Sequence, residues 1–574
     1  MISASEKSLM KGADIVVDSL VREGTEIIFG YPGGASMEIH QAITRVEEKG
    51  ARLRLVLVRH EQGGGFAAQG YARATGKPGV VLTTSGPGAT NLVTPVADAM
   101  MDSVPIICIT GQVPTAMIGR DAFQETDVTG VTRPITKHAF LVKSLDDLPV
   151  VIHDAFKLAV SGRPGPVVVD IPKDVQQSVD APPGEITRSL FRKSLSPPDP
   201  PEEALKKVAE AIAAAHKPVL YVGGGAVASG AAEEIRALVE KCRIPVAQTL
   251  LGLGVVPGSH PLFYGMLGMH GSVASNYAVH HADLLLAFGV RFDDRVTGKL
   301  DEFCKHGTIV HIDIDASELN KNKRADIGIV ADLKESLKRL LPMLQEKNHD
   351  RWIEELDGVR RDKPFHIPDM GEKITPQAVL SLLNQRLTSE TIVTTGVGQH
   401  QMFAAQFLTF EEPRRWLTSG GLGTMGFGLP AAMGAQLARP EATVINIDGD
   451  GSFQMNIQEL ATCYSDRIPV KSLILNNQHL GMVAQWEDRF YGANRAHTYI
   501  GDPEADGPYP DFVAIAQGYR IPGRRVTKLE EVADALDEML AAKTAFVLDV
   551  ITPYQEHVLP MIPSGKTFRD LIYR

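Results

Sequence analysis

Two short polar motifs follow apolar, strand-like runs in the last third of the chain. Gly449-Asp450-Gly451 lies just after the run ATVINI, and the next apolar run ends at Asn476-Asn477. Mg²⁺ takes about six oxygen ligands, usually one or two protein side chains together with phosphate and water. Asp450, the Asn477 amide and a backbone carbonyl near His479 could supply the protein ligands, and glycines let the backbone approach phosphate. This spacing predicts a cation site for a bound diphosphate.

The segment between the two motifs is predicted to be a helix from about Asn456, with Asn456 and Glu459 as a capping pair. GDG alone also fits an ordinary tight turn. Together with NN at this separation, it resembles the thiamine diphosphate motif of the enzymes that depend on this cofactor. The resemblance implies a second half of the site: a carboxylic acid that exchanges a proton with the aminopyrimidine ring, from a different domain and usually a partner chain.

Glu61 is the candidate for that acid. It lies just past the strand-like run LRLVLV and opens a stretch of small residues, EQGGGFAAQGYARATG, that is expected to be helical. A lone glutamate at a helix start ordinarily only stabilises the helix dipole, but the site required by the GDG half favours the catalytic interpretation. Loops rich in Gly and Pro, at residues 31–34 and 85–91, suit a flat ligand lying against backbone, although each could be a simple turn.

Composition bounds the class of protein. The 574 residues are too many for one core and predict three domains. With 44% hydrophobic and 22% charged residues the chain resembles a soluble globular protein, and its net charge of -11 argues against a nucleic-acid binder. The four scattered cysteines form no CxxC pair, which indicates free thiols. Because no apolar run could cross a bilayer and the N-terminus has no signal-peptide core, we expect a cytoplasmic enzyme and no membrane partner.

β-Branched apolar runs alternate with helix-like stretches along most of the chain. Such runs include EIIFG, GVVLTTSG, VPIICITG, GPVVVDIP, KPVLYVGGG, IPVAQTL, ADLLLAFGV, TIVHIDID and TIVTTGVGQH. This alternation predicts an α/β fold with parallel, doubly wound sheets, whose sites gather at the carboxyl ends of strands. A Pro-rich stretch at 197–201 and a charged stretch before residue 372 are interpreted as linkers. We therefore expect three doubly wound parallel-sheet domains, at residues 1–187, 200–345 and 372–574.

A series of segments along the chain resembles one family. They are GYPGG, RHEQ, TSGPGATN, DAFQE, SGRPGP, GMHGS, RFDDRVTGK, SGGLGTMGFG, GDGSF, LNNQ, MVAQWEDRFY and HVLPMIPSG. In these segments the chain is similar to the catalytic subunit of the biosynthetic, FAD-containing acetohydroxyacid synthases, also called acetolactate synthases. RFDDRVTGK and the segment around Trp486 are the most specific parts of the match.

The resemblance implies an activity. Enzymes of this family decarboxylate pyruvate on thiamine diphosphate (ThDP) and transfer the two-carbon unit to pyruvate or to 2-ketobutyrate, at the first common step of branched-chain amino-acid biosynthesis. The resemblance further implies ThDP, Mg²⁺ and FAD as cofactors, in a pyrimidine-binding, a central FAD-binding and a diphosphate-binding domain, the last with a C-terminal covering tail. It also implies a homodimer or dimer of dimers and a separate regulatory small subunit.

The resemblance carries roles over to particular residues. The residues implied in catalysis are Glu61, Phe123, Gln124, Lys173, Arg295 and Trp486. Those implied in ThDP binding are Tyr31, Pro32, Gly33, Glu61, Val397, Gly398, Gln399, His400, Gly423, Met425, Gly449, Asp450, Gly451, Ser452, Asn477, His479, Gly481 and Met482, with Asp450, Asn477 and His479 at the Mg²⁺. Those implied in FAD binding are Arg163, Gly223, Gly224, Gly225, Thr249, Leu250, Gly268, Met269, His270, Gly289, Arg291, Asp294, Arg295, Asp313, Ile314 and Asp332.

Several of these residues also have an ordinary structural interpretation. Met425 would wedge between the two rings of ThDP in the family, but a methionine in an apolar stretch is usually core. Trp486 fits the wall of an acceptor pocket, with plain core burial as the alternative. Arg295 has a planar fork that suits a substrate carboxylate, while the RFDDR segment could be only a solvated charge run. The glycines at 223–225 lack the full GxGxxG spacing and are a weak signal alone.

Two other functions remain open at this point. A flavin-dependent pyruvate oxidase would use the same cofactors but pass electrons to FAD, and reduction of the flavin by pyruvate would identify it. A catalytically silent scaffold that binds ThDP and FAD is the second, although intact Glu61, Asp450 and Asn477 argue against it.

Overall fold

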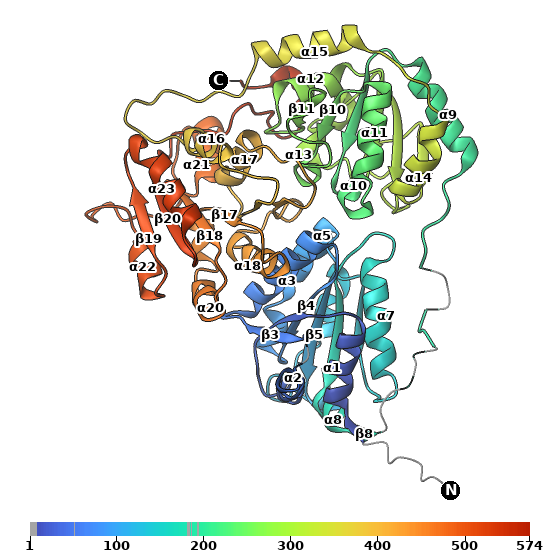
Figure 1. Ribbon diagram of the computed structural model, residues 1–574, viewed down its shortest axis with the longest axis vertical. Helices are drawn as coiled ribbons and strands as arrows, with labels where there is room; N and C mark the ends of the chain where they lie inside the picture. Colours follow the sequence, from blue (N-terminus) through green and yellow to red (C-terminus); the bar gives the residue numbers. More distant parts are fainter. Residues whose placement is uncertain are drawn as a thin grey trace. The chain divides into compact units, whose positions relative to one another are not determined.

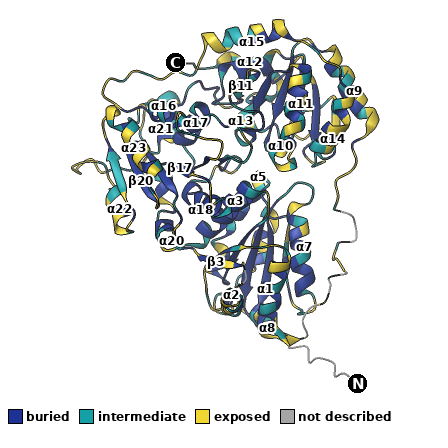
Figure 2. Cartoon of the chain, in the orientation of Figure 1, coloured by how far each residue is buried: buried dark blue, intermediate teal, exposed yellow. Residues whose placement is uncertain are grey.

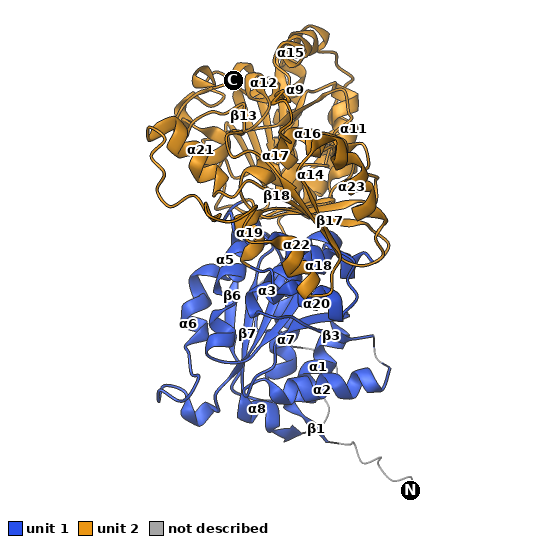
Figure 3. Cartoon of the chain, turned by 90° about the vertical axis from the view of Figure 1, so that its left-hand side faces the viewer, with its two compact units in different colours: residues 1–196, 421–440, 456–470 blue, residues 197–420, 441–455, 471–574 orange. Residues whose placement is uncertain are grey.

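A computed structural model of the chain describes residues 9–50, 52–180, 184, 186, 188–191 and 195–573. The predicted domain bounds at residues 1, 187 and 574, and most of the N-terminus that was searched for a signal peptide, lie outside the described residues. The chain divides into two compact units (Figure 3). Unit 1 comprises residues 1–196, 421–440 and 456–470, and unit 2 comprises residues 197–420, 441–455 and 471–574.

Unit 1 is built on a six-stranded parallel sheet with the order β3-β2-β4-β5-β7-β6. The strands are β2 (Ile27–Gly30), β3 (Arg54–Leu57), β4 (Gly79–Thr83), β5 (Ile106–Gln112), β6 (His138–Leu141) and β7 (Val167–Pro172). Every residue of β4, β5 and β7 is buried, as expected for central parallel strands covered on both faces. A small antiparallel pair joins β1 (Met10–Lys11) to β8 (Val179–Asp180).

Two helices of unit 1, α3 and α18, approach each other very closely. The helices of this unit are α1 (Gly12–Arg22), α2 (Met37–Glu48), α3 (Glu61–Thr75), α4 (Pro87–Thr90), α5 (Val93–Asp102), α6 (Val128–Thr132), α7 (Leu148–Val160), α8 (Lys173–Gln177), α18 (Gly428–Ala438) and α20 (Glu459–Ser465). A Cβ added at Gly70 of α3 would clash with the Ala431 carbonyl of α18, and one at Gly434 with the Ala67 carbonyl. Phe66 and Phe427 pack edge to face beside this contact, with ring centroids 5.5 Å apart. The small residues after Glu61 are therefore explained by helix packing.

Unit 2 contains two further six-stranded parallel sheets. The middle sheet has the order β11-β10-β9-β12-β13-β14, from β9 (Pro218–Val222), β10 (Val246–Gln248), β11 (Phe263–Met266), β12 (Leu284–Phe288), β13 (Thr308–Asp313) and β14 (Ile327–Val330). The third sheet has the order β16-β15-β17-β18-β20-β19, from β15 (Ile392–Thr395), β16 (Trp416–Leu417), β17 (Val444–Gly449), β18 (Lys471–Asn476), β19 (Gly523–Val526) and β20 (Phe546–Ile551). The longer helices of unit 2 are α9 (Glu202–Ala214), α11 (Ala232–Cys242), α12 (Val273–His281), α14 (Leu333–Leu340), α15 (Asp350–Asp362), α16 (Pro376–Asn384), α17 (Gln399–Phe407), α21 (Gly481–Phe490), α22 (Phe512–Gly518) and α23 (Leu529–Ala541); α10 (Gly224–Ser229), α13 (Asp294–Thr297) and α19 (Asp450–Gln454) are short.

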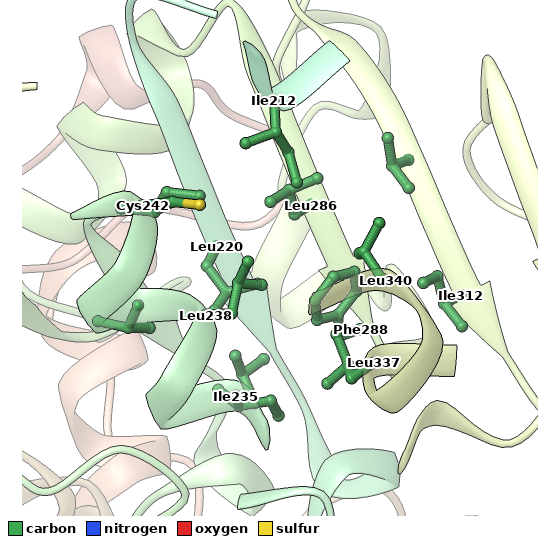
Figure 4. Packing of buried hydrophobic residues seen from close by; sticks show 14 of the residues in the cluster. Ile212, Leu220, Ile235, Leu238, Cys242, Leu286, Phe288, Ile312, Leu337 and Leu340 are labelled. Atoms are coloured by element: carbon green, nitrogen blue, oxygen red, sulfur yellow. The ribbon is translucent and has the colours of Figure 1, made fainter. Parts of the chain in front are cut away.

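Helices cover the strands of each sheet, so that buried residues lie between layers and exposed residues on the outer helix faces (Figure 2). On one face of the middle sheet, Leu220 and Phe288 pack against Leu238 of α11 and Leu337 of α14 (Figure 4). All four side chains are fully buried. This packing follows from the apolar stripes of α11 and α14, which recur at helical spacing.

In each six-stranded sheet, the strands that follow the first one are added on one side of it and then on the other, so the winding direction reverses once. Figure 1 shows β17, β18, β20 and β19 of the third sheet side by side. The reversal falls between β2 and β4 in unit 1, between β9 and β12 in the middle sheet, and between β15 and β17 in the third sheet. Ligands of open α/β sheets bind outside the carboxyl ends of strands at such switch points. The predicted fold class, three doubly wound parallel sheets, is confirmed.

One local prediction is wrong. The chain after Asp450 does not form a single helix from Asn456: α19 ends at Gln454, and α20 begins at Glu459 after Gln458 as its N-cap. Asn456 and Glu459 do not cap each other through their side chains, because each side chain bonds to a distant backbone group. None of the helices in the described part of the chain combines the length and apolarity that crossing a bilayer requires.

Candidate active site

Glu61 lies at the carboxyl end of β3, as the first residue of α3. The imidazole Nδ1 of His60 caps this helix by accepting the Gln62 N–H at 3.1 Å. The Asn91 amide donates a hydrogen bond to Glu61 Oε2 at 2.9 Å, and a Cβ at Gly88 would lie only 3.3 Å from Oε1. The half-buried carboxylate is thus oriented by one amide and lies against bare glycine backbone.

Loops of unit 1 bring the other predicted residues to the same carboxyl edge. Tyr31, Pro32 and Gly33 follow β2, and a Cβ at Gly33 would lie 2.5 Å from Thr84, which follows β4. Gly86, also after β4, abuts Gln124: a Cβ there would lie 2.8 Å from the Gln124 carbonyl oxygen.

The loop that carries Phe123 and Gln124 is internally braced. Its Phe123 side chain is 88% exposed, and Gln124 has a φ of +59°, a backbone conformation that is uncommon outside glycine. The Glu125 carboxylate accepts N–H groups from the start of the loop, at Gly119 and at Ala122. These bonds hold the pKa of the Glu125 carboxyl below its usual value. Positive φ held by such bracing is typical of functional loops.

Gly423 and Met425 also lie in unit 1, although the sequence places them in the third domain. Their loop is held to α5 by two hydrogen bonds, from Gly421 N–H to Asp102 at 2.7 Å and from the Thr424 hydroxyl to Asp98 at 2.9 Å. Lys173 opens α8 directly after β7, and Arg163 donates to the Ser103 hydroxyl at 2.8 Å. Arg163 is therefore in a different unit from the rest of the predicted FAD contacts, which are all in unit 2.

Asp450 is the central group at the switch point of the third sheet. It follows β17, opens α19 and is only 3% exposed, and its Oδ2 has no hydrogen-bond partner. Burial raises the pKa of this carboxyl to about 7. A buried carboxylate oxygen without a partner is costly unless a cation or donor reaches it. Asp450 thus fits a Mg²⁺ ligand.

Asn477 and His479 follow β18, which pairs with β17, the strand that precedes Asp450. Asn477 Oδ1 accepts the His479 N–H at 3.0 Å, and Asn477 Nδ2 donates to Gln399 Oε1 at 3.2 Å. A Cβ at Gly481 would clash with the Gln399 amide and lie 2.5 Å from Asn477 Nδ2. The described residues contain no group of three or more His, Cys, Asp or Glu side chains that could hold a metal. A Mg²⁺ site here would rest on one carboxylate, an amide and backbone oxygen.

His400 lines the same switch point from α17. A Cβ at Gly449 would lie 2.7 Å from its Nδ1, so glycine is required for the backbone to pass the imidazole. Burial lowers the pKa of His400 to about 3 and raises the pKa of the neighbouring Asp448 to about 7. His400 Nε2 lies 3.5 Å from Asp448 Oδ1. The other predicted ThDP residues in unit 2, Val397, Gly398, Gly451, Ser452 and Met482, lie in the same segments.

Glycine residues follow the two strands at the switch point of the middle sheet: Gly223–Gly225 after β9 and Gly289 after β12. Gly225 donates its N–H to the Gly289 carbonyl at 3.1 Å, and Gly289 has a φ of +59°. Buried His270 has an Nδ1 without a hydrogen-bond partner, and burial lowers its pKa to about 4. Bare backbone and an unpartnered imidazole nitrogen fit a dinucleotide such as FAD.

Other predicted FAD residues already have local partners. Asp313 accepts the Asp315 N–H at 2.9 Å, and Asp332 caps α14 by accepting the Glu335 N–H at 3.0 Å. The remaining members of the predicted set lie in the segments that follow β9, β10, β11, β12 and β13, in loops or at helix starts: Gly223, Gly224, Thr249, Leu250, Gly268, Met269, Arg291, Asp294 and Ile314.

The two residues assigned to the acceptor substrate both reach solvent. The Arg295 side chain is 63% exposed and lies 3.8 Å from Asp294. Trp486 on α21 is only half-buried and packs on Phe490, with ring centroids 4.9 Å apart. Plain core burial does not describe Trp486.

Sequence reasoning missed three polar residues that hold these segments. Asn91 closes the TSGPGATN segment, and its position in the motif was the one available signal. Gln485, buried on α21, accepts from Gln399 at 3.0 Å and from the Val558 N–H at 2.8 Å. Glu459 accepts the N–H groups that precede Glu61. No local pattern identifies contacts of this kind.

Three family models match the chain in sequence order. Residues 10–131 match the N-terminal TPP-binding domain of thiamine pyrophosphate enzymes, residues 205–340 their central domain, and residues 396–550 their C-terminal TPP-binding domain. The chain is 55% identical over 570 residues to acetolactate synthase 1, chloroplastic, of Oryza sativa subsp. japonica, covering 98% of this chain and 88% of that one. It is 54% identical over 570 residues to acetolactate synthase, chloroplastic, of Arabidopsis thaliana, covering 98% of this chain and 84% of that one.

The predicted cytoplasmic location is wrong by this comparison. The relatives are named as chloroplastic proteins, which contradicts that prediction. The prediction was based on the composition, on the absence of a signal-peptide core and on an N-terminus that is not an Arg- and Ser-rich transit segment.

The two TPP-binding family models cover all of the predicted ThDP residues. The two TPP-binding matches contain the strand ends that carry Glu61 and Asp450, so each half of the predicted ThDP site lies in a domain known for that cofactor. ThDP is therefore a cofactor of this chain, and pyruvate is its substrate. With 54–55% identity to named relatives over nearly its full length, the chain belongs to the acetolactate synthase family of thiamine diphosphate-dependent enzymes.

Proposed function

We propose that the chain condenses pyruvate with a second 2-keto acid, with loss of CO₂. Pyruvate as acceptor gives 2-acetolactate and 2-ketobutyrate gives 2-aceto-2-hydroxybutyrate, the first common step of branched-chain amino-acid biosynthesis. The observation that carries the proposal is a pair of carboxylates at strand ends. Glu61 is oriented by the Asn91 amide, and Asp450 is buried with an oxygen that has no partner.

The chemistry of each residue defines its role at the ThDP. When bound, ThDP supplies an electron sink for a carbanion at the substrate's carbonyl carbon. Glu61 holds and exchanges a proton with N1′ of the pyrimidine, and Asn91 keeps the carboxylate aimed at that nitrogen. Asp450 and Asn477, with a backbone carbonyl near His479, would hold Mg²⁺, which would neutralise the charge of the diphosphate.

The acceptor substrate is held by different groups. Arg295 pairs with its carboxylate, because a planar guanidinium can donate two parallel hydrogen bonds. Trp486 supplies an apolar wall, where one extra methylene is worth ~1–3 kcal/mol, enough to favour 2-ketobutyrate. Phe123, Gln124 and Lys173 complete the catalytic set, with Phe123 as a wall and Gln124 as a hydrogen-bonding amide.

We assign FAD to the switch point of the middle sheet. The glycine backbone at 223–225 and 289 and the unpartnered His270 nitrogen support this position. Condensation of two keto acids transfers no electrons to an acceptor, so FAD has a structural role in this proposal.

The assembly follows from the resemblance to the family. We propose a homodimer or dimer of dimers and a separate regulatory small subunit. The domain bounds of the proposal are residues 1–187 for pyrimidine binding, 200–345 for FAD and 372–574 for the diphosphate with a covering tail. The tail runs close to the site residues of unit 2: Gln399 donates to the Glu556 carbonyl at 2.8 Å, and Ile562 donates its N–H to the Met269 carbonyl at 2.8 Å.

The test is acetolactate production by the purified chain with pyruvate, ThDP, Mg²⁺ and FAD, while the flavin absorbance is followed. Acetolactate with the flavin remaining oxidised is the expected result, and added 2-ketobutyrate then gives the acceptor preference. Bleached flavin with acetate as the product would instead support a pyruvate oxidase and remove the acceptor roles of Arg295 and Trp486.

A further inference from the structure

We propose that Glu459 is a positioning residue for Glu61: its buried carboxyl group anchors the turn that aims Glu61, by hydrogen-bond geometry and not by charge. Glu459 is the first residue of α20, nine residues after Asp450 in the chain, and does not touch any group assigned to substrate or cofactor. The inference rests on the proposed catalytic role of Glu61.

The carboxyl group of Glu459 reaches the turn between β3 and α3. Its Oε1 accepts the N–H groups of Arg59 and His60, both at 3.0 Å. The second oxygen accepts the Thr462 hydroxyl at 2.8 Å and lies 3.2 Å from the Arg59 nitrogen. All of these groups belong to unit 1. Arg59 and His60 come directly before Glu61 in the chain. Their N–H groups therefore determine where the backbone leaves β3 and where Glu61 lies at the start of α3.

The turn depends on this carboxyl group. Glu459 is fully buried, and the space for it exists because residue 63 is glycine: a Cβ there would lie 2.6 Å from Oε1. Without Glu459, the N–H groups of Arg59 and His60, two half-buried residues, would lose their acceptor, and the backbone of the turn would shift to find another. The Arg59 side chain adds a second tie to α20 through the Ser465 hydroxyl at 3.2 Å.

The geometry separates positioning from charge. A glutamine at 459 could keep its amide oxygen at the place of Oε1, accepting both backbone N–H groups, while its NH₂ donates to the Thr462 hydroxyl oxygen. An aspartate keeps the acid but is one methylene too short to reach both donors. Positioning therefore predicts that Glu459→Gln is the mild variant and Glu459→Asp the damaging one, whereas a charge or proton-transfer role predicts the reverse order.

The experiment compares Glu459→Gln, Glu459→Asp and Glu459→Leu in the full-length holoenzyme. For Leu we expect kcat to fall about tenfold to a hundredfold, because a shift of about 1 Å in a catalytic group has effects of this size, with KM for pyruvate within about twofold. Asp should be intermediate, and Gln should keep more than about half of the wild-type kcat. If Leu does not fold, the order of Gln and Asp decides alone.

A matched control comes from the other end of the same strand. The half-buried Glu47 carboxylate accepts the Leu55 N–H at 2.8 Å, which is the same kind of bond at the start of β3. Glu47→Leu should leave kcat unchanged, because Leu55 lies at the end of β3 that does not lead to Glu61.

Amide hydrogen exchange gives a readout that needs no turnover. In Glu459→Leu the Arg59 and His60 amides should exchange at least about tenfold faster, while β4 is unchanged; Glu459→Gln should exchange like the wild type. The inference is overturned if Leu leaves kcat or these two amides unchanged, or if Gln is as impaired as Leu. If the wild type itself makes no acetolactate, the proposed function fails, and the exchange result still decides whether Glu459 anchors the turn.

Discussion

Two carboxylates at strand ends, Glu61 in unit 1 and Asp450 in unit 2, have opposite surroundings. Glu61 is half-buried and accepts a hydrogen bond from Asn91, in a turn held by Glu459. Asp450 is 3% exposed, burial raises its pKa to about 7, and one oxygen has no partner. The first arrangement fits the role proposed for Glu61, a carboxylate that exchanges protons with a ligand. The second fits the role proposed for Asp450, because a bound cation would offset the cost of burying its carboxylate.

Glu61→Gln should have the largest effect on activity, and it tests the proposed role of Glu61 in proton exchange. The amide keeps the size of the side chain but cannot exchange a proton with the pyrimidine, so acetolactate formation should fall by about 10²–10⁴-fold, the usual contribution of acid–base catalysis. ThDP binding should persist, because the residues proposed to hold Mg²⁺ and the diphosphate are elsewhere, at Asp450 and Asn477. The measurement is kcat together with a ThDP titration, and full activity in this variant would remove Glu61 from catalysis.

Gly481→Ala tests the proposed Mg²⁺ site of unit 2, which includes Asp450 and Asn477. The added Cβ would displace the Gln399 amide and with it Asn477, both of which are flexible side chains, so the fold should persist. We expect the Mg²⁺ concentration for half-maximal activity to rise about 10–100-fold, as for loss of a residue that orients a metal ligand. Gly518→Ala, where a Cβ meets nothing within 4 Å, is the matched control. An unchanged Mg²⁺ requirement would mean that Asn477 is not a ligand.

Trp486→Leu should affect neither carboxylate. It removes the half-buried ring that is assigned to the acceptor pocket, and the preference for 2-ketobutyrate over pyruvate should drop about tenfold. Self-condensation of pyruvate should continue. The product ratio at equal acceptor concentrations measures this, and a wild-type ratio would count against the pocket role.

Asp170 shows that burial alone does not make a site. Burial raises its pKa to about 7, like that of Asp450, but both of its oxygens have partners, in the Thr110 hydroxyl at 2.6 Å and the Gln112 amide at 2.9 Å. The folded chain keeps this proton to about pH 7 while the unfolded chain loses it near its ordinary value of 3.8, so stability falls as pH rises between these values.

Asp170→Asn should therefore flatten the decline of Tm between about pH 4 and pH 7, by a few degrees, without changing the response to Mg²⁺. Asp199→Asn, at an exposed side chain, serves as the control and should keep the wild-type slope. A slope that is the same in Asp170→Asn and the wild type would show that Asp170 is ionised throughout.

The central strands could be predicted from the sequence, and several edge strands could not. Runs such as GVVLT and VVVDIP are apolar throughout and become fully buried strands. The strands β6, β11, β14 and β19 lie at sheet edges, where one side needs no apolar cover, and GRRV of β19 carries two arginines. Each of these four strands has only four residues, which is too short a run to indicate a strand.

Some residues of the site could likewise be predicted from the sequence, and others could not. Glu61, Asp450 and Asn477 could be found because their residue types and their places after strands match a known chemistry. Asn91 and Glu459 act across 30 and about 400 residues, through hydrogen bonds to a carboxylate and to backbone that exist only in the folded unit. Glu459 was given a local capping role for this reason, since sequence spacing indicates neighbours along a helix and not contacts across the fold.

Direct binding of ThDP to Glu61→Gln and Asp450→Ala, with and without Mg²⁺, tests most directly whether the two carboxylates have separate functions. Calorimetric titration should give Mg²⁺-dependent binding to the wild type and to Glu61→Gln with similar affinity, and no measurable binding to a folded Asp450→Ala. Binding to Asp450→Ala with wild-type affinity, or loss of binding in Glu61→Gln, would contradict the assignment.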